Sequence, residues 1–130
     1  MPYRFEFDPE HRILLVVLEG NVGEREILTI NDDIKARVSE LNPSAGISDF
    51  SAVTTFAVAS HIMRSAALQP SPYHEQTPRF IVAPTDLLFG LARMYQLVGY
   101  RTRAKLQVVR SREEVFSALR VQNPRFEKLP

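Results

Sequence analysis

The sequence predicts one α/β domain built on a mixed, mostly parallel five-stranded sheet. Its 130 residues match the usual size of a single domain. Short apolar runs typical of buried strands alternate with amphipathic segments typical of helices. The resulting order, ββαβαβαβα, requires parallel pairing through right-handed crossovers for every strand after an opening hairpin.

The first elements predict an antiparallel hairpin. Tyr3–Asp8 alternates aromatic and charged residues, as a half-buried strand does. After a turn, residues 12–19 form a nearly continuous apolar run, which is typical of a strand covered on both faces. Gly20 and Gly23, at the two ends of the segment 20–23, indicate the end of this strand.

The remaining elements follow from periodicity and capping. Residues 24–41 place isoleucine, valine and leucine at helical spacings of 3, 4, 4 and 3. Thr85 is suited to cap a later helix, and Ser111 with Glu114 forms a capping box before the last one. The other predicted strands cover residues 45–50, 79–83 and 105–109, and another helix covers residues 57–68.

No repeat or linker divides the chain. We therefore expect one domain over residues 1–122 and a loose C-terminal tail over residues 123–130, which contains two prolines. The chain has no cysteine, its N-terminal residues do not resemble a signal peptide, and its longest apolar stretch is too short to span a bilayer. These features predict a cytoplasmic protein without a membrane span.

Charge is unevenly distributed along the chain. Residues 1–65 carry 6 basic and 10 acidic side chains, whereas residues 66–130 carry 10 and 5. The basic residues near the last strand are a candidate anion-binding patch, or simply a solvated face that protects a sheet edge. With a net charge of only +1, we do not expect nucleic-acid binding. The candidate patch consists of Arg93, Arg101, Arg103 and Arg110.

Polar residues follow the predicted strand at residues 45–50 and reach into the next predicted helix. Ligands of open α/β sheets bind beyond the carboxyl ends of parallel strands, so this edge is a candidate partner or ligand surface. The alternative is structural, because serine and threonine hydroxyls also satisfy loop and helix-start amides. The candidate surface consists of Asp49, Ser51, Thr54, Thr55, Ser60 and His61.

These residues do not form catalytic machinery. A triad needs a base within hydrogen-bond reach of the nucleophile, and the neighbours Ser60 and His61 point about 100° apart on a helix. The sequence has no Gly-x-Ser-x-Gly segment, no His-x-x-x-His pair and no glycine-rich phosphate loop. We therefore expect no enzyme activity, no metal and no cofactor.

The order of elements resembles the STAS domain, the fold of the bacterial anti-sigma-factor antagonists. Residues 47–54, Ile-Ser-Asp-Phe-Ser-Ala-Val-Thr, resemble that family's strand-and-turn segment. Residues 81–84, 89–93 and 108–114 are similar to a divergent branch of small bacterial proteins within it. The resemblance implies a regulatory protein–protein interaction module in bacterial signalling.

One departure from the family concerns its phosphorylation site. Phosphorylatable STAS domains continue this segment with Asp-Ser-Ser-Gly, whose second serine caps a helix and accepts phosphate. Residues 55–61 contain no such motif, and Ser60 fits the serine position only with a one-residue insertion. We expect the serine phospho-switch to be absent, with Ser60 as the candidate phosphorylation site if it operates.

The sequence thus predicts a non-enzymatic module with a protein partner, and it leaves a homodimer open. The alternative is a small-ligand or lipid-binding domain with a pocket between helices and sheet. The long loop at residues 70–78 is either a recognition loop, with Tyr73 and His74 as its contact groups, or an insertion without a role. The alternative pocket would be lined by Phe50, Phe56, Met63 and Phe89.

Overall fold

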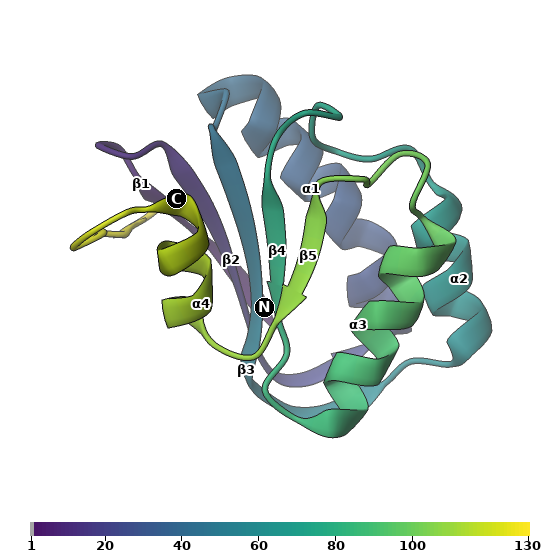
Figure 1. Cartoon of the computed structure of the whole chain (residues 1–130). Coiled ribbons are helices and arrows are strands. Elements are labelled where there is room, and N and C mark those ends of the chain that lie inside the picture. Colours follow the sequence, from purple (N-terminus) through teal and green to yellow (C-terminus); the bar gives the residue numbers. More distant parts are fainter. Residues whose placement is uncertain (1) are drawn as a thin grey trace.

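The computed structural model describes residues 2–130 and contains a six-stranded sheet with helices on both faces (Figure 1). The strand order is β5-β4-β3-β2-β1-β6. Helices α1, α2 and α3 cover one face and α4 covers the other (Figure 1). The elements are β1 (Tyr3–Asp8), β2 (Ile13–Gly23), α1 (Glu24–Leu41), β3 (Ala45–Ala57), α2 (Ser60–Leu68), β4 (Arg79–Val82), α3 (Asp86–Val98), β5 (Leu106–Val109), α4 (Arg112–Leu119) and β6 (Glu127–Lys128).

The predicted class and pairing are confirmed. Strands β1 and β2 form the antiparallel hairpin, and β2, β3, β4 and β5 pair in parallel. The predicted count of five strands is wrong, because the two-residue β6 adds a sixth. Hydrophobic periodicity cannot reveal a strand of two residues, since alternation needs several positions to become visible.

Strand β6 also changes the interpretation of the C-terminal segment. It pairs antiparallel with β1, and the Arg125 amide donates a hydrogen bond to Asp8 Oδ2 over 3.3 Å. Phe126 stacks on Phe116 of α4, with ring centroids 6.2 Å apart. Residues 123–130, expected as a loose tail beyond a domain of residues 1–122, instead lie along the sheet edge and pack against α4.

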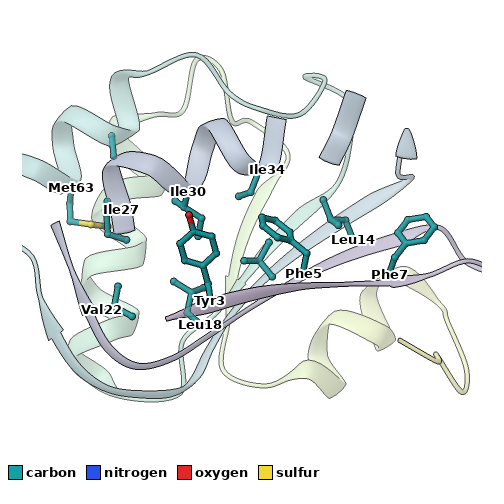
Figure 2. Packing of buried hydrophobic residues seen from close by; sticks show 12 residues of the cluster. Tyr3, Phe5, Phe7, Leu14, Leu18, Val22, Ile27, Ile30, Ile34 and Met63 are labelled. Atoms are coloured by element: carbon teal, nitrogen blue, oxygen red, sulfur yellow. The ribbon is translucent and has the colours of Figure 1, made fainter. Parts of the chain in front are cut away.

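The two faces of β2 build two cores, as expected for a strand covered on both sides. Because successive side chains of a strand point to opposite faces, Leu14 and Leu18 meet α1 while Ile13 and Leu15 meet the α4 side. All four are fully buried. Figure 2 shows the α1 side, where the β1 aromatic residues and the β2 leucines lie beneath the isoleucines of α1.

Strands β2 and β3 are longer than predicted. Residues 20–23, expected to end the hairpin, pair with the outer half of β3, which runs to Ala57 instead of ending at residue 50. Two register shifts each add one residue to β3, between Asp49 and Ala52 and between Val53 and Thr55. These bulges break the two-residue alternation, so the pattern resembled a turn. Helix α2 consequently begins at Ser60 rather than at residue 57.

The capping predictions are confirmed. Helix α1 spans residues 24–41 as expected. The Thr85 hydroxyl accepts a hydrogen bond from the Leu88 amide over 3.3 Å at the start of α3. The Ser111 hydroxyl accepts one from the Glu114 amide over 3.3 Å, which closes the capping box of α4. Local polar signals therefore located these helix starts correctly.

Candidate functional site

Asp49 organises the carboxyl end of β3. Its side chain is buried, and its residue is only 3% exposed. One carboxylate oxygen, Oδ1, accepts hydrogen bonds from the Ser51 amide at 2.9 Å and the Ser51 hydroxyl at 2.6 Å. The other, Oδ2, accepts one from Arg112 Nε at 2.5 Å. A buried carboxylate requires such partners, so Asp49 fixes Ser51 and holds the start of α4 against β3. It is not itself an exposed contact residue.

The hydroxyl residues that follow lie on a strand, not at a turn. Ser51, Thr54 and Thr55 are exposed on the outer half of β3. The expectation that such hydroxyls satisfy helix-start amides is wrong here, because the N-cap of α2 is Ala59. Only Ser51 bonds locally, to Asp49. Among residues 2–130, Thr54 and Thr55 make no side-chain hydrogen bond, which leaves both hydroxyls facing solvent.

The outer half of β3 has a free edge. Its inner half pairs with both β2 and β4, but residues 51–57 pair with β2 alone among the strands of residues 2–130. The bulges turn Phe50, Val53 and Phe56, spaced three apart, towards the apolar core under the helices. The remaining side chains of this half-strand point away from the core. An edge of this kind offers backbone donors and acceptors to another chain.

Ser60 and His61 continue this surface at the start of α2. Ser60 is the first helical residue, and both side chains are exposed. The Ala59 carbonyl closes the first turn by accepting the amides of Ile62 at 3.0 Å and Met63 at 3.2 Å. The structure therefore exposes five of the six predicted surface residues along one segment, residues 51–61, and buries Asp49.

The predicted basic patch does not form. Arg103 is 2% exposed, and its guanidinium donates to the carbonyl oxygens of Ala67 at 2.6 Å and Gln69 at 3.0 Å. It satisfies the C-terminal end of α2 and does not face solvent. Arg110 lies beyond the opposite end of β5, pairs with Asp86 at 3.0 Å and covers the Phe89 ring.

The other two arginines of that prediction, Arg93 and Arg101, are exposed. Arg93 lies within α3 and donates to Gln96 at 2.6 Å, whereas Arg101 follows the C-terminal end of that helix. Two of the four residues are thus tied to other roles, and the strand β5 separates Arg103 from Arg110. The arginines share a stretch of sequence rather than a surface.

Two cavities lie between the helices and the sheet. The smaller, about 20 Å³, is lined by Phe50, Phe56 and Met63 from the predicted pocket, while Phe89 is not among its lining residues. The larger, about 90 Å³, also contacts Phe50 and Met63 but extends towards the loop at residues 70–78. That loop turns Tyr73 inward, a placement that its sequence did not reveal.

Two arginines, one buried and one partly exposed, were missed as site residues. Arg79 opens β4 and is 4% exposed, and Arg112 holds Asp49. A signal existed for the second, since a carboxylate predicted at the end of a buried strand needs a cationic partner. Within the described part of the chain, no three histidine or acidic side chains gather into a metal site. No helix in residues 2–130 is long and apolar enough to cross a membrane.

This arrangement of sheet and helices is the STAS fold, as expected from the order of elements. It is shared by the anti-sigma-factor antagonist SpoIIAA in its unphosphorylated form, with a TM-score of 0.58 and 12% sequence identity over 93% of this chain and 99% of that chain. The Bacillus cell fate determinant SpoIIAA in its phosphorylated form also shares the fold, with a TM-score of 0.53 and 13% sequence identity over 90% of this chain and 98% of that chain. No protein-family model and no curated protein sequence matches the chain.

Proposed function

We propose that the protein is a non-enzymatic regulatory module of bacterial signalling that binds a protein partner through one surface. This surface, the β3–α2 surface, consists of Ser51, Thr54, Thr55, Ser60 and His61. The observation that carries the proposal is the exposure of these residues on one segment of the chain, whose first member, Ser51, is held by Asp49 and Arg112. Similarity to an anti-sigma-factor antagonist over 93% of the chain supports a protein partner.

The chemistry of the surface suits protein binding. Its hydroxyls donate and accept hydrogen bonds without carrying charge, and its free strand edge offers backbone groups to an added strand. Because Asp49 bonds to Ser51 over 2.9 and 2.6 Å, part of the surface is already ordered before a partner arrives. Preordered groups lose less conformational entropy on binding.

We infer binding without turnover. Catalysis by Ser60 would need a base within hydrogen-bond reach, and residues 2–130 provide no hydrogen bond from His61 or any other side chain to its hydroxyl. The absence of cysteine supports a reducing compartment, the bacterial cytoplasm, as the place of action.

The binding is proposed to operate without a serine phospho-switch, because the Asp-Ser-Ser-Gly motif is absent. Ser60 is nevertheless exposed at the start of a helix, where amides and the helix dipole would stabilise a phosphate. We expect Ser60→Ala, which adds no charge to the surface, to bind the partner within about twofold of the wild type, a difference below about 0.5 kcal/mol, and we expect Ser60 to carry no phosphate in cells. Loss of binding in Ser60→Asp, together with phosphate on Ser60 in cells, would restore the switch.

The interaction is tested by affinity capture from the source bacterium, followed by titration with the purified partner. Thr54→Arg and Thr55→Arg place a bulky charge on the β3–α2 surface and should weaken binding at least about tenfold. Ser117→Arg is the matched control, because Ser117 is exposed on α4, across the sheet. If both threonine variants bind as tightly as the control, the surface is not the interface.

A further inference from the structure

The larger cavity has an apolar body. It lies between helices α1, α2 and α3 and strands β3 and β4, and has a volume of about 90 Å³. Isoleucines of α1, including Ile30 and Ile34, form one wall, and Met63 of α2 and Phe50 of β3 form another. These side chains belong to the hydrophobic core under the helices, so they offer a ligand dispersion contacts but no hydrogen bonds.

Tyr73 and Arg79 both line this cavity, and each carries a buried donor without a partner. Arg79 donates through its two terminal nitrogens, to Ser71 Oγ at 2.5 Å and to the Thr102 carbonyl at 2.9 Å. Its Nε and the Tyr73 hydroxyl have no hydrogen-bond partner among residues 2–130, and both atoms are buried. Burial raises the pKa of Tyr73 well above its usual value, so the hydroxyl keeps its proton and remains a donor. Unmet buried donors of this kind are rare in folded proteins.

Tyr73 and Arg79 meet at Gly46. Arg79 is paired in register with Gly46 of the neighbouring strand β3, and a Cβ at position 46 would overlap the Tyr73 hydroxyl. The Arg79 guanidinium carbon is 5.6 Å from the centre of the Tyr73 ring. The absence of a side chain at Gly46 thus lets the hydroxyl reach the sheet beside Arg79.

The charge of this region is positive, and Glu75, which does not line the cavity, acts on Arg79 only as a weaker opposing charge. The residues that line the cavity include Arg79 and Arg103 but no aspartate or glutamate. Neither arginine forms an ion pair within residues 2–130, although both are at least 96% buried. Burial and the neighbouring charge of Arg103 lower the pKa of Arg79. A buried cation without a counter-ion is costly, so an anion placed here would be stabilised.

We propose that this cavity binds a monocarboxylate with an apolar body. One carboxylate oxygen accepts from Arg79 Nε and the other from the Tyr73 hydroxyl, while the apolar body lies against Ile30 and Met63. Two donors match the two oxygens of a carboxylate, and charge-assisted bonds of this type are the strong ones. Inorganic phosphate fits less well, because it has no apolar body to lie against the walls formed by Ile30 and Met63.

Isothermal titration with octanoate tests the proposal on the full chain. We expect saturable 1:1 binding, at least about tenfold tighter than that of 1-octanol, which has the same apolar body without charge. Inorganic phosphate should not bind measurably. A second titration, with 3-phenylpropionate, tests whether the cavity prefers an aromatic body or a linear chain. The proposal is supported if either acid binds at least about tenfold tighter than 1-octanol. Equal affinity for octanoate and octanol, or no saturable binding of either acid, would overturn it.

Two variants locate the binding. Tyr73→Phe removes only a hydroxyl without a partner, so the fold loses no hydrogen bond and octanoate affinity should fall about five- to twentyfold. Arg79→Gln should reduce affinity by about tenfold or more, whereas Arg93→Gln, the same change at an exposed site on α3, should leave it unchanged. Unchanged octanoate affinity in Tyr73→Phe would refute the assignment, even if Arg79→Gln fails to fold.

Discussion

Replacement of Tyr73 by phenylalanine should stabilise the protein in the absence of ligand. The Tyr73 hydroxyl is buried and has no partner among residues 2–130, so folding removes it from water without replacing its hydrogen bonds. The cost of such a group is about 1–3 kcal/mol. We therefore expect Tyr73→Phe to raise the free energy of unfolding by about 1–2 kcal/mol, or the melting temperature by about 3–8 °C. Urea denaturation followed by circular dichroism measures the first quantity.

Tyr3 provides the matched control. Its hydroxyl points towards α1 (Figure 2), donates to Asp33 and lies 3.3 Å from Thr29 Oγ1. Burial and the bond to Asp33 raise the pKa of Tyr3. Tyr3→Phe deletes the same atom but breaks satisfied bonds, so it should destabilise the protein by about 1–2 kcal/mol. If Tyr73→Phe destabilises to the same extent, the Tyr73 hydroxyl is satisfied in solution and the cavity loses its unmet donor.

Three further substitutions test the packing and the pH dependence. Gly46→Ala should destabilise by about 1–3 kcal/mol because its methyl group overlaps Tyr73, and a double-mutant cycle with Tyr73→Ala should be strongly non-additive in urea denaturation. Arg103→Met leaves buried carbonyls of α2 without a donor, so amide exchange in the last turn of α2 should accelerate at least about tenfold. Burial acts to raise the pKa of Asp8, but the hydrogen bonds that its carboxylate accepts lower the pKa below 3.8. The bond from the His11 side chain has the largest effect among them. Asp8→Asn should therefore have a free energy of unfolding about 1–3 kcal/mol lower than that of the wild type at pH 7. The difference should close as pH falls through the folded-state pKa of Asp8, and urea denaturation at a series of acidic pH values measures it.

The sequence predicted elements whose signals are local. The spacing of isoleucines in α1 and the hydroxyl caps at Thr85 and Ser111 depend only on residues within one or two turns. The outer half of β3 was not predicted, because it has no such local signal. Its two bulges shift the inward-facing positions to every third residue, as at Phe50, Val53 and Phe56, a period that belongs to neither a regular strand nor a helix.

The site was less predictable because its contacts join distant segments. Asp49 was identified, but its partner Arg112 is 63 residues away, and no local pattern links them. Arg103 was assigned to a charged surface because its sequence neighbours are basic. Its actual partners are backbone carbonyls, which every residue possesses, so no side-chain pattern could predict its burial.

The β3–α2 surface and the carboxylate cavity can be tested separately because Gly46 and Arg79 lie at the start of β3 and β4, whereas the surface begins beyond Asp49 on β3. Gly46 and Arg79 form the first residue pair between β3 and β4, and Asp49 and Val82 form the last. Thr54→Arg should therefore leave octanoate affinity unchanged, and Tyr73→Phe should leave partner affinity unchanged. Phe50 lines the cavity and directly follows Asp49, and Met63 lines it two residues after His61, so these two residues would couple the regions. If saturating octanoate changes partner affinity by some factor, thermodynamic linkage requires the partner to change octanoate affinity by the same factor. Unequal factors would mean that octanoate acts on the partner instead.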